Sequence, residues 1–138
     1  MELLSCLDEL PIDKNCDLPY KRMTFDGCKY YFLSEREEKI VVMDLDFNLI
    51  RSVDVCKEYT CICYDCSENC FWATAKNCFN TIFKLNYKLE EVDTLKINEL
   101  NKLGGIITGI SYNYCCDSLL ISLNNCIDEY HKTTKDLK

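Results

Sequence analysis

The residues most able to do chemistry are the cysteines, 12 of them in a chain of 138 residues. The densest group has the spacing Cys61-x-Cys63-x2-Cys66-x3-Cys70. Thiolates in such a group are the soft ligands that zinc and iron–sulfur clusters prefer. Only Cys66 and Cys70 flank a turn as metal ligands usually do, whereas Cys61 and Cys63 fall on one predicted strand. We therefore expect no metal, and we interpret Cys61 and Cys63 as small core residues.

Catalytic groups are scarce in the rest of the chain. His131 is the single histidine, so acid–base or triad chemistry of the usual kind would rest on it alone. It falls in a predicted strand near the C-terminus, with no serine or cysteine nucleophile placed beside it. Neighbouring carboxylates such as Glu90 and Glu91 fall on hairpins and read as solvated charge. We expect no catalytic constellation and no cofactor.

Composition argues against several classes of partner. The formal charge is -7, and the basic residues are scattered singly rather than gathered into a stripe that could neutralise phosphates, so we expect no nucleic acid. The N-terminus lacks a basic leader, and no apolar run has the length of a membrane span. We expect a cytoplasmic protein with free thiols and no membrane partner. The abundance of lysine and asparagine is typical of AT-rich bacterial genomes.

An internal repeat organises the chain. Residues 59–65 match residues 107–113, which lie 48 positions later, and residues 71–75 match 119–123 in the same register. An earlier copy lies about 40 residues upstream, where residues 23–26 match 62–65, residues 31–34 match 71–74 and residues 42–49 match 82–89.

Each copy predicts four short strands separated by turn residues. A polar turn follows the first strand at Asp26-Gly27 and again at 65–69. The triplets 46–48 and 86–88 reverse the third strand into the fourth. The expected strands are 23–26, 30–34, 40–45 and 49–55 in the first copy, 60–64, 70–75, 81–85 and 89–95 in the second, and 108–112, 118–123 and 127–132 in the third.

The first strand of each copy alternates large and small side chains. This pattern predicts a strand buried on both faces, with one face kept small so that a neighbouring sheet can approach. Arg22 is the one charged residue at these alternating positions. The large set is Met23, Phe25, Ile62, Tyr64, Ile110 and Tyr112, and the small set is Thr24, Cys61, Cys63, Gly109 and Ser111.

Through its aromatic-Asp turn, its apolar second strand and its Leu-Asp/Asn-x-x-Leu hairpin, the chain resembles β-propeller blades. The resemblance implies an all-β fold in a single domain, residues 1–138. It contains three four-stranded propeller-type blades, at about 20–55, 59–97 and 107–138, which make half of a six-bladed β-propeller. No subfamily motif is present, so the resemblance implies no activity for any residue.

Counting strands leaves the third blade one outer strand short, and residues 1–10 are the candidate closing strand. Three blades in an open arc would expose sheet faces and edges. We expect a homodimer in which two copies join head to tail into a six-bladed ring. The alternative is that the chain is part of a longer propeller.

Propeller geometry places ligands at the loops around the channel mouth, which here nominates Tyr59, Asn77 and Asn125. The function we expect is a non-catalytic binding or scaffolding domain for a protein or peptide partner. A glycan-binding propeller is the alternative, and a channel-mouth hydrolase or lyase a more distant one. A glycan-binding function needs exposed aromatic side chains, and the candidates are Tyr20, Tyr59, Tyr87 and Tyr130. Trp72 could also stack on a sugar, but we expect it in the core.

Overall fold

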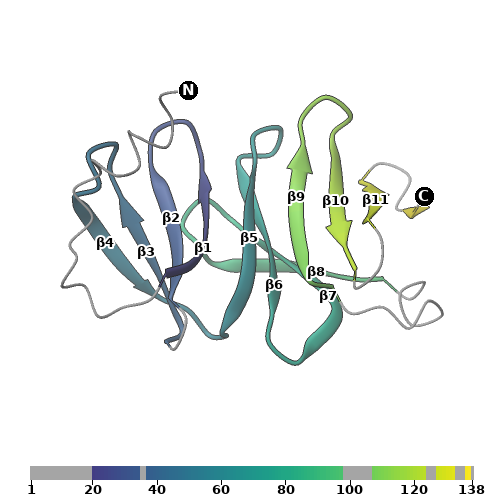
Figure 1. Ribbon diagram of the computed structural model, residues 1–138, viewed down its shortest axis with the longest axis horizontal. Helices are drawn as coiled ribbons and strands as arrows, with labels where there is room; N and C mark the ends of the chain where they lie inside the picture. Colours follow the sequence, from purple (N-terminus) through teal and green to yellow (C-terminus); the bar gives the residue numbers. More distant parts are fainter. Residues whose placement is uncertain (1–19, 35–36, 98–106, 124–126, 133–135, 138) are drawn as a thin grey trace, which may run out of the picture.

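The computed structural model describes residues 20–34, 37–97, 107–123, 127–132 and 136–137. Strands joined by turns make up this part of the chain, and it contains no helix of the length and apolar character that crossing a bilayer requires. The strands form three antiparallel sheets in chain order, as the repeat predicts (Figure 1).

Each sheet takes consecutive strands and pairs them with their neighbours in sequence. The first sheet holds β1 (Tyr20–Phe25), β2 (Tyr30–Ser34), β3 (Lys39–Met43) and β4 (Leu49–Asp54). The second holds β5 (Tyr59–Asp65), β6 (Cys70–Ala75), β7 (Cys78–Leu85) and β8 (Glu91–Lys96). The third holds β9 (Gly109–Asn113), β10 (Ser118–Ser122), β11 (Ile127–His131) and β12 (Asp136–Leu137).

The third sheet differs from the expectation that its outer strand is missing. The two-residue β12 pairs with β11 through Tyr130 and Leu137, and so occupies the fourth position. The closing strand expected at residues 1–10 lies outside the described residues, as does most of the polar loop that separates the second and third copies.

Polar side chains close the hairpins. Asp44 accepts hydrogen bonds from the backbone of Asp46 and Asn48, and Asn86 does the same for Lys88 and Glu90. Such Asx turns reverse the chain without using ladder hydrogen bonds.

These turns correct the alignment of the first copy of the repeat with the second. Asp44 is equivalent to Asn86 and not to Lys84, because Asp44 and Asn86 accept the same backbone hydrogen bonds in their turns. Tyr30, rather than Tyr31, is equivalent to Phe71, because each pairs with the last aromatic residue of the inner strand. The paired residues Phe25 and Tyr30 are five positions apart, whereas Tyr64 and Phe71 are seven apart, so the first hairpin of the second copy is two residues longer.

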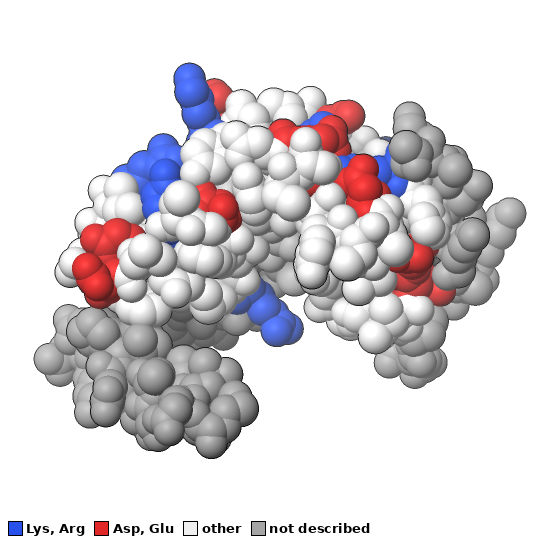
Figure 2. Space-filling model, turned by 90° about the horizontal axis from the view of Figure 1, so that it is seen from above, with Lys and Arg blue, Asp and Glu red and all other residues white. Residues whose placement is uncertain are grey.

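The three sheets stand side by side through their first strands, with β5 between β1 and β9 (Figure 1). One apolar core lies between the first and second sheets, and a second core lies between the second and third. Seen from above, the molecule forms an arch with a hollow on one side (Figure 2).

Each interface joins a small face to a large face. Cys61 and Cys63 of β5 point toward the third sheet and pack against its Ile110 and Leu119, while Ile62 of β5 packs in the other core. The core assignment of Cys61, Cys63 and Trp72 is confirmed, since all three are buried.

Burial on both faces holds for β5 alone among the three inner strands. Met23 and Phe25 of β1 remain 47% and 43% exposed, and Ser111 of β9 is exposed. The reason is position: β5 belongs to the middle sheet, whereas the first and third sheets each have a neighbour on one side only.

Candidate functional site

Two adjoining pockets lie along the inner strands, with volumes of about 490 Å³ and 320 Å³. Arg22 of β1 and Thr108, which precedes β9, line both. The larger pocket extends over β9 and β10, and the smaller one over the end of β6 and the turn that follows it. A concave surface near the first strands of several sheets is a favourable place for a ligand, because groups from different elements converge there.

Hydroxyl pairs recur on this inner surface at equivalent positions of the repeat. The hydroxyls of Thr60 and Thr74 lie 2.8 Å apart, and those of Thr108 and Ser122 lie 3.0 Å apart. Within the Thr60–Thr74 pair one hydroxyl donates to the other, so one hydrogen stays available for a ligand acceptor. In the Thr108–Ser122 pair the Thr108 hydroxyl also lies 3.1 Å from the backbone carbonyl of Ser122, to which it donates, so both hydroxyl hydrogens have acceptors within the protein. Gly109 faces Ser122 so closely that a Cβ there would lie 2.8 Å from the Ser122 hydroxyl oxygen. A side chain at Gly109 would therefore crowd the second pair.

The three residues nominated from the sequence have different surroundings. Asn77 is exposed, has a φ of 66° in the turn between β6 and β7, and lines the smaller pocket. Tyr59 is 4% exposed, with its ring packed against Phe83 and its hydroxyl 3.5 Å from Glu91. Asn125 lies outside the described residues.

The lone histidine is not arranged as a catalytic base. The Ser118 hydroxyl donates to Glu129 at 2.6 Å, and Nε2 of His131 lies 3.2 Å from the other oxygen of the same carboxylate. In a triad the histidine stands between the nucleophile and the acid. Here Glu129 stands between Ser118 and His131, so the histidine cannot take the serine proton.

Glu91 is more than the solvated charge that its sequence position suggests. Its carboxylate lies 2.6 Å from Nζ of Lys57 and also accepts from the Cys56 thiol at 3.4 Å. Burial opposes ionisation of Glu91, but the hydrogen bonds from Lys57 and Cys56 outweigh it and lower its pKa.

The only group of three potential metal ligands in the described part of the chain is Asp65, Glu68 and Cys70. Lys132 lies against this group, with Nζ 2.5 Å from Asp65, 2.7 Å from Glu68 and 2.8 Å from Asp117. An ammonium ion thus supplies the positive charge that these carboxylates need. Burial, the main cause, raises the pKa of the Cys70 thiol to about 12, so Cys70 remains a thiol.

The Lys132 contacts join two sheets. Asp65 ends β5, Asp117 lies in the turn between β9 and β10, and Lys132 follows β11. Trp72 donates its indole N–H to the fully buried Asp65 at 2.8 Å. Burial alone would raise the pKa of Asp65, but the hydrogen bonds from Lys132, Ser67 and Trp72 lower it. The sequence indicated a turn at Asp65, but no residue near Asp65 in the sequence identifies Lys132 as the partner of its carboxylate.

A related contact joins the first two sheets. Asp26, which follows β1, accepts a hydrogen bond from the Tyr31 hydroxyl at 2.8 Å and another from the Tyr87 hydroxyl. Tyr87 lies in the turn between β7 and β8. In both cases a residue that follows the third strand of one sheet contacts an aspartate of the preceding sheet. That aspartate lies at the end of the inner strand or directly after it.

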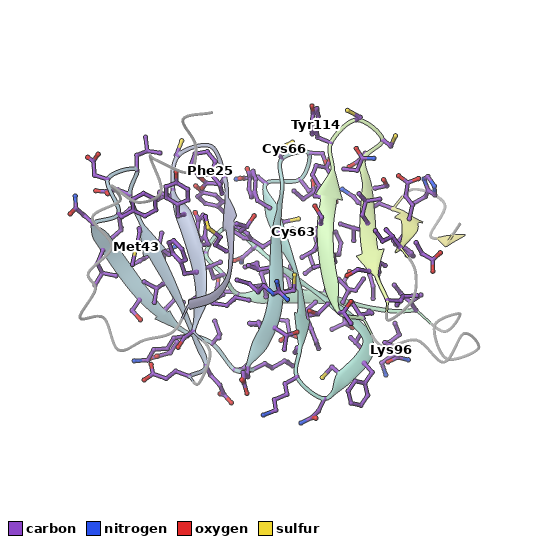
Figure 3. The ribbon with its side chains drawn as sticks, viewed as in Figure 1. Phe25, Met43, Cys63, Cys66, Lys96 and Tyr114 are labelled. Atoms are coloured by element: carbon purple, nitrogen blue, oxygen red, sulfur yellow. The ribbon has the colours of Figure 1, made fainter. Side chains whose placement is uncertain are left out.

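Most aromatics considered for sugar stacking belong to the core. Tyr59 and Tyr130 are buried, Trp72 is 5% exposed, and Tyr87 packs on Phe71. The side chain of Tyr20 lies outside the described residues. Tyr114 is 76% exposed at the turn between β9 and β10 (Figure 3).

Comparison with known proteins gives a fold and no family. No protein-family model matches the chain, and no curated protein matches it. Among solved structures, a chain of "Kuenenia stuttgartiensis Hydrazine Synthase" is similar with a TM-score of 0.63 and 12% sequence identity. The match covers 93% of this chain and 37% of the other, so this chain spans well under half of its neighbour's length. At that identity the similarity concerns the all-β fold alone.

Proposed function

We propose that this chain is a non-catalytic binding or scaffolding domain of the β-propeller type, with a protein or peptide partner bound on its inner surface. Two copies associate head to tail into a ring of six sheets. The observation that supports the association is the pairing of small with large inner-strand residues at the interfaces within the chain: Cys61 and Cys63 share a core with Ile110, and Thr24 accepts a hydrogen bond from the Tyr64 backbone.

The outer faces of the first and third sheets have the same complementary character. The third sheet presents Gly109 and Ser111, equivalent to Cys61 and Cys63 on the small face of the second sheet. The first sheet presents Met23 and Phe25, equivalent to Ile62 and Tyr64 on the large face of the second. Placing the large face of one copy on the small face of another repeats the interface that the chain already makes twice.

The turns support the same direction of association. Asn113 occupies the position of Asp26 and Asp65, with its amide 3.3 Å from Glu129 of its own sheet. The turn between β3 and β4, equivalent to the one that carries Tyr87, presents Leu45 at 58% exposure. In the proposed ring this turn of one copy meets the Asn113 turn of the other. A closed ring with two-fold symmetry makes this contact twice.

Light scattering coupled to size-exclusion chromatography tests the association. We expect the wild-type chain to elute at twice its mass of 16.2 kDa. Phe25→Glu and Ser111→Arg each place a charge in the proposed interface, so each is expected to give a folded monomer, because a charge is costly to bury without a partner.

The matched control is Val92→Glu, at a residue 54% exposed on β8 of the middle sheet. It should leave the mass at that of the dimer. A wild-type monomer with the circular dichroism of a folded β-protein would refute the association, as would dimers that tolerate both interface charges.

Affinity capture tests the site of partner binding. Thr108 lines both pockets, so Thr108→Trp should block the inner surface and remove the partner that the wild-type chain retains from its native cell extract. Val92→Trp is the control, and we expect it to retain the partner. Equal retention by both variants would show that the partner binds elsewhere.

A further inference from the structure

Arg22 has an unusual position in the repeat. It is equivalent to Cys61 of β5 and Gly109 of β9, since each of the three lies three residues before the last aromatic residue of its inner strand. The other two positions hold small residues, while the first holds the longest cationic side chain. Arg22 is exposed and lines both pockets of the inner surface.

The charge of Arg22 is not neutralised within the described part of the chain, where it makes no ion pair with a carboxylate. The second cation among the residues that line the two pockets, Lys76, lies 3.7 Å from the carboxylate of Glu58, which stands outside the two pockets. The lining residues include no aspartate or glutamate. This contrasts with the whole chain, which has 23 acidic residues against 16 basic ones. A basic side chain projects into the hollow of the arch (Figure 2).

The groups around Arg22 are hydrogen-bond donors. The Thr60–Thr74 pair has a hydroxyl hydrogen to offer. Asn77, beside Lys76, adds an amide to the smaller pocket. A guanidinium presents planar N–H donors that match the oxygens of a carboxylate or a phosphate in pairs. Hydrogen-bond donors around a guanidinium that has no carboxylate partner in the described residues are what an oxyanion requires.

We propose that Arg22 and the Thr60–Thr74 hydroxyl pair form a binding site for an oxyanion, a carboxylate or a phosphoryl group, on the inner surface of the arch. The assignment of that oxyanion to a peptide partner rests on the proposed function. The site itself does not, because every residue in it belongs to one copy of the chain.

NMR titration of the ¹⁵N-labelled protein tests the site, with sodium acetate and sodium phosphate as separate probes at constant ionic strength. We expect saturable shifts of the Arg22 Nε–H and of the Thr60 and Thr74 amides. The probe with the higher affinity identifies the chemical source. Arg22→Gln should weaken binding at least about tenfold, the range for losing a hydrogen bond to a charged group.

Arg51→Gln is the matched control, because Arg51 is an exposed arginine of β4 away from both pockets. It should bind both probes like the wild type. Equal affinity of Arg22→Gln and wild type, or shifts spread over the basic residues without saturation, would overturn the site. Light scattering on the same samples separates the two proposals: a monomer that binds the anion contradicts only the ring, and a dimer that does not bind it contradicts only this site.

Discussion

Lys132 illustrates how one side chain can satisfy a buried carboxylate. Its ammonium lies within hydrogen-bonding distance of Asp65, Glu68 and Asp117, and also above the rings of Trp72 and Tyr112. Burial opposes the charge on Lys132, but the hydrogen bonds to the three carboxylates raise its pKa. The charges therefore depend on one another, and the loss of one leaves another without its partner.

Lys132→Met should destabilise the protein by about 3 kcal/mol, because Asp65 would remain fully buried without its cation. Urea unfolding followed by the fluorescence of Trp72, the single tryptophan, measures the change. Lys88→Met is the control, since Lys88 is exposed and its replacement should change stability by less than about 0.5 kcal/mol. Equal effects of the two variants would mean that the Lys132 contacts contribute nothing.

The same carboxylates predict how stability depends on pH. Hydrogen bonds from Lys132, Tyr112 and Ser67 lower the pKa of Asp117 from 3.8 to about 2, and the pKa of Asp65 is also lowered. A lowered pKa stabilises the fold above the unfolded value, and this stabilisation is lost as the pH falls toward the folded value. Because the pKa of Lys132 is raised above 10.5, the lysine stays charged from acid to neutral pH, and the change in stability there comes from its carboxylate partners.

The free energy of unfolding should therefore be constant near neutrality and should fall between about pH 4 and pH 2. Urea titrations at a series of pH values check this expectation. Lys132→Met should show a shallower decline, because removing the lysine lets both aspartates approach their ordinary pKa values. The same decline in both proteins would assign the acid sensitivity to other carboxyl groups.

At the scale of the strand and turn, the sequence predicted most of the first and second sheets. Alternating apolar residues and the Asp or Asn turns located each strand to within a few residues. The register failed at Tyr31 and Asp44, because turns of unequal length shift the later strands of a copy. The two-residue β12 was missed, since two residues are too few to show any alternation.

The turn contacts give a prediction for these elements. Tyr87→Phe removes the hydroxyl that crosses from the second sheet to Asp26 of the first, and should cost about 1 kcal/mol. The hydroxyl of Tyr31 still donates to Asp26, which limits the loss. Tyr114→Phe is the control, because Tyr114 is 76% exposed.

A double-mutant cycle of Tyr87→Phe with Asp26→Asn isolates the contact across the two sheets. We expect a coupling free energy of about 0.5 kcal/mol or more from urea unfolding. A coupling near zero would mean that the contact between Tyr87 and Asp26 does not help to hold the two sheets together.

At the scale of the whole molecule, the main feature is that the first and third sheets each have one face without a neighbouring sheet. At the inner strand, the first sheet presents exposed Met23 and Phe25, and the third presents Gly109 and Ser111.

Mixing the two interface variants tests the polarity of the proposed ring. Phe25→Glu retains an intact third-sheet face, and Ser111→Arg retains an intact first-sheet face. The mixture should therefore form a heterodimer with one intact interface, weaker than the wild type, while each variant alone stays monomeric. Native mass spectrometry detects it by mass. Association of either variant with itself at the same concentration would contradict the head-to-tail arrangement.

The sequence by itself determined the strands, the turns, the repeat and the small and large sides of each inner strand, since these depend on local alternation and turn chemistry. Only the tertiary structure decided which of those sides are covered, and that Lys132 meets Asp65 across 67 positions of sequence. It also placed Arg22 with hydroxyls of the second and third sheets. Contacts between sheets depend on how the sheets stand beside one another, and no local pattern records that arrangement.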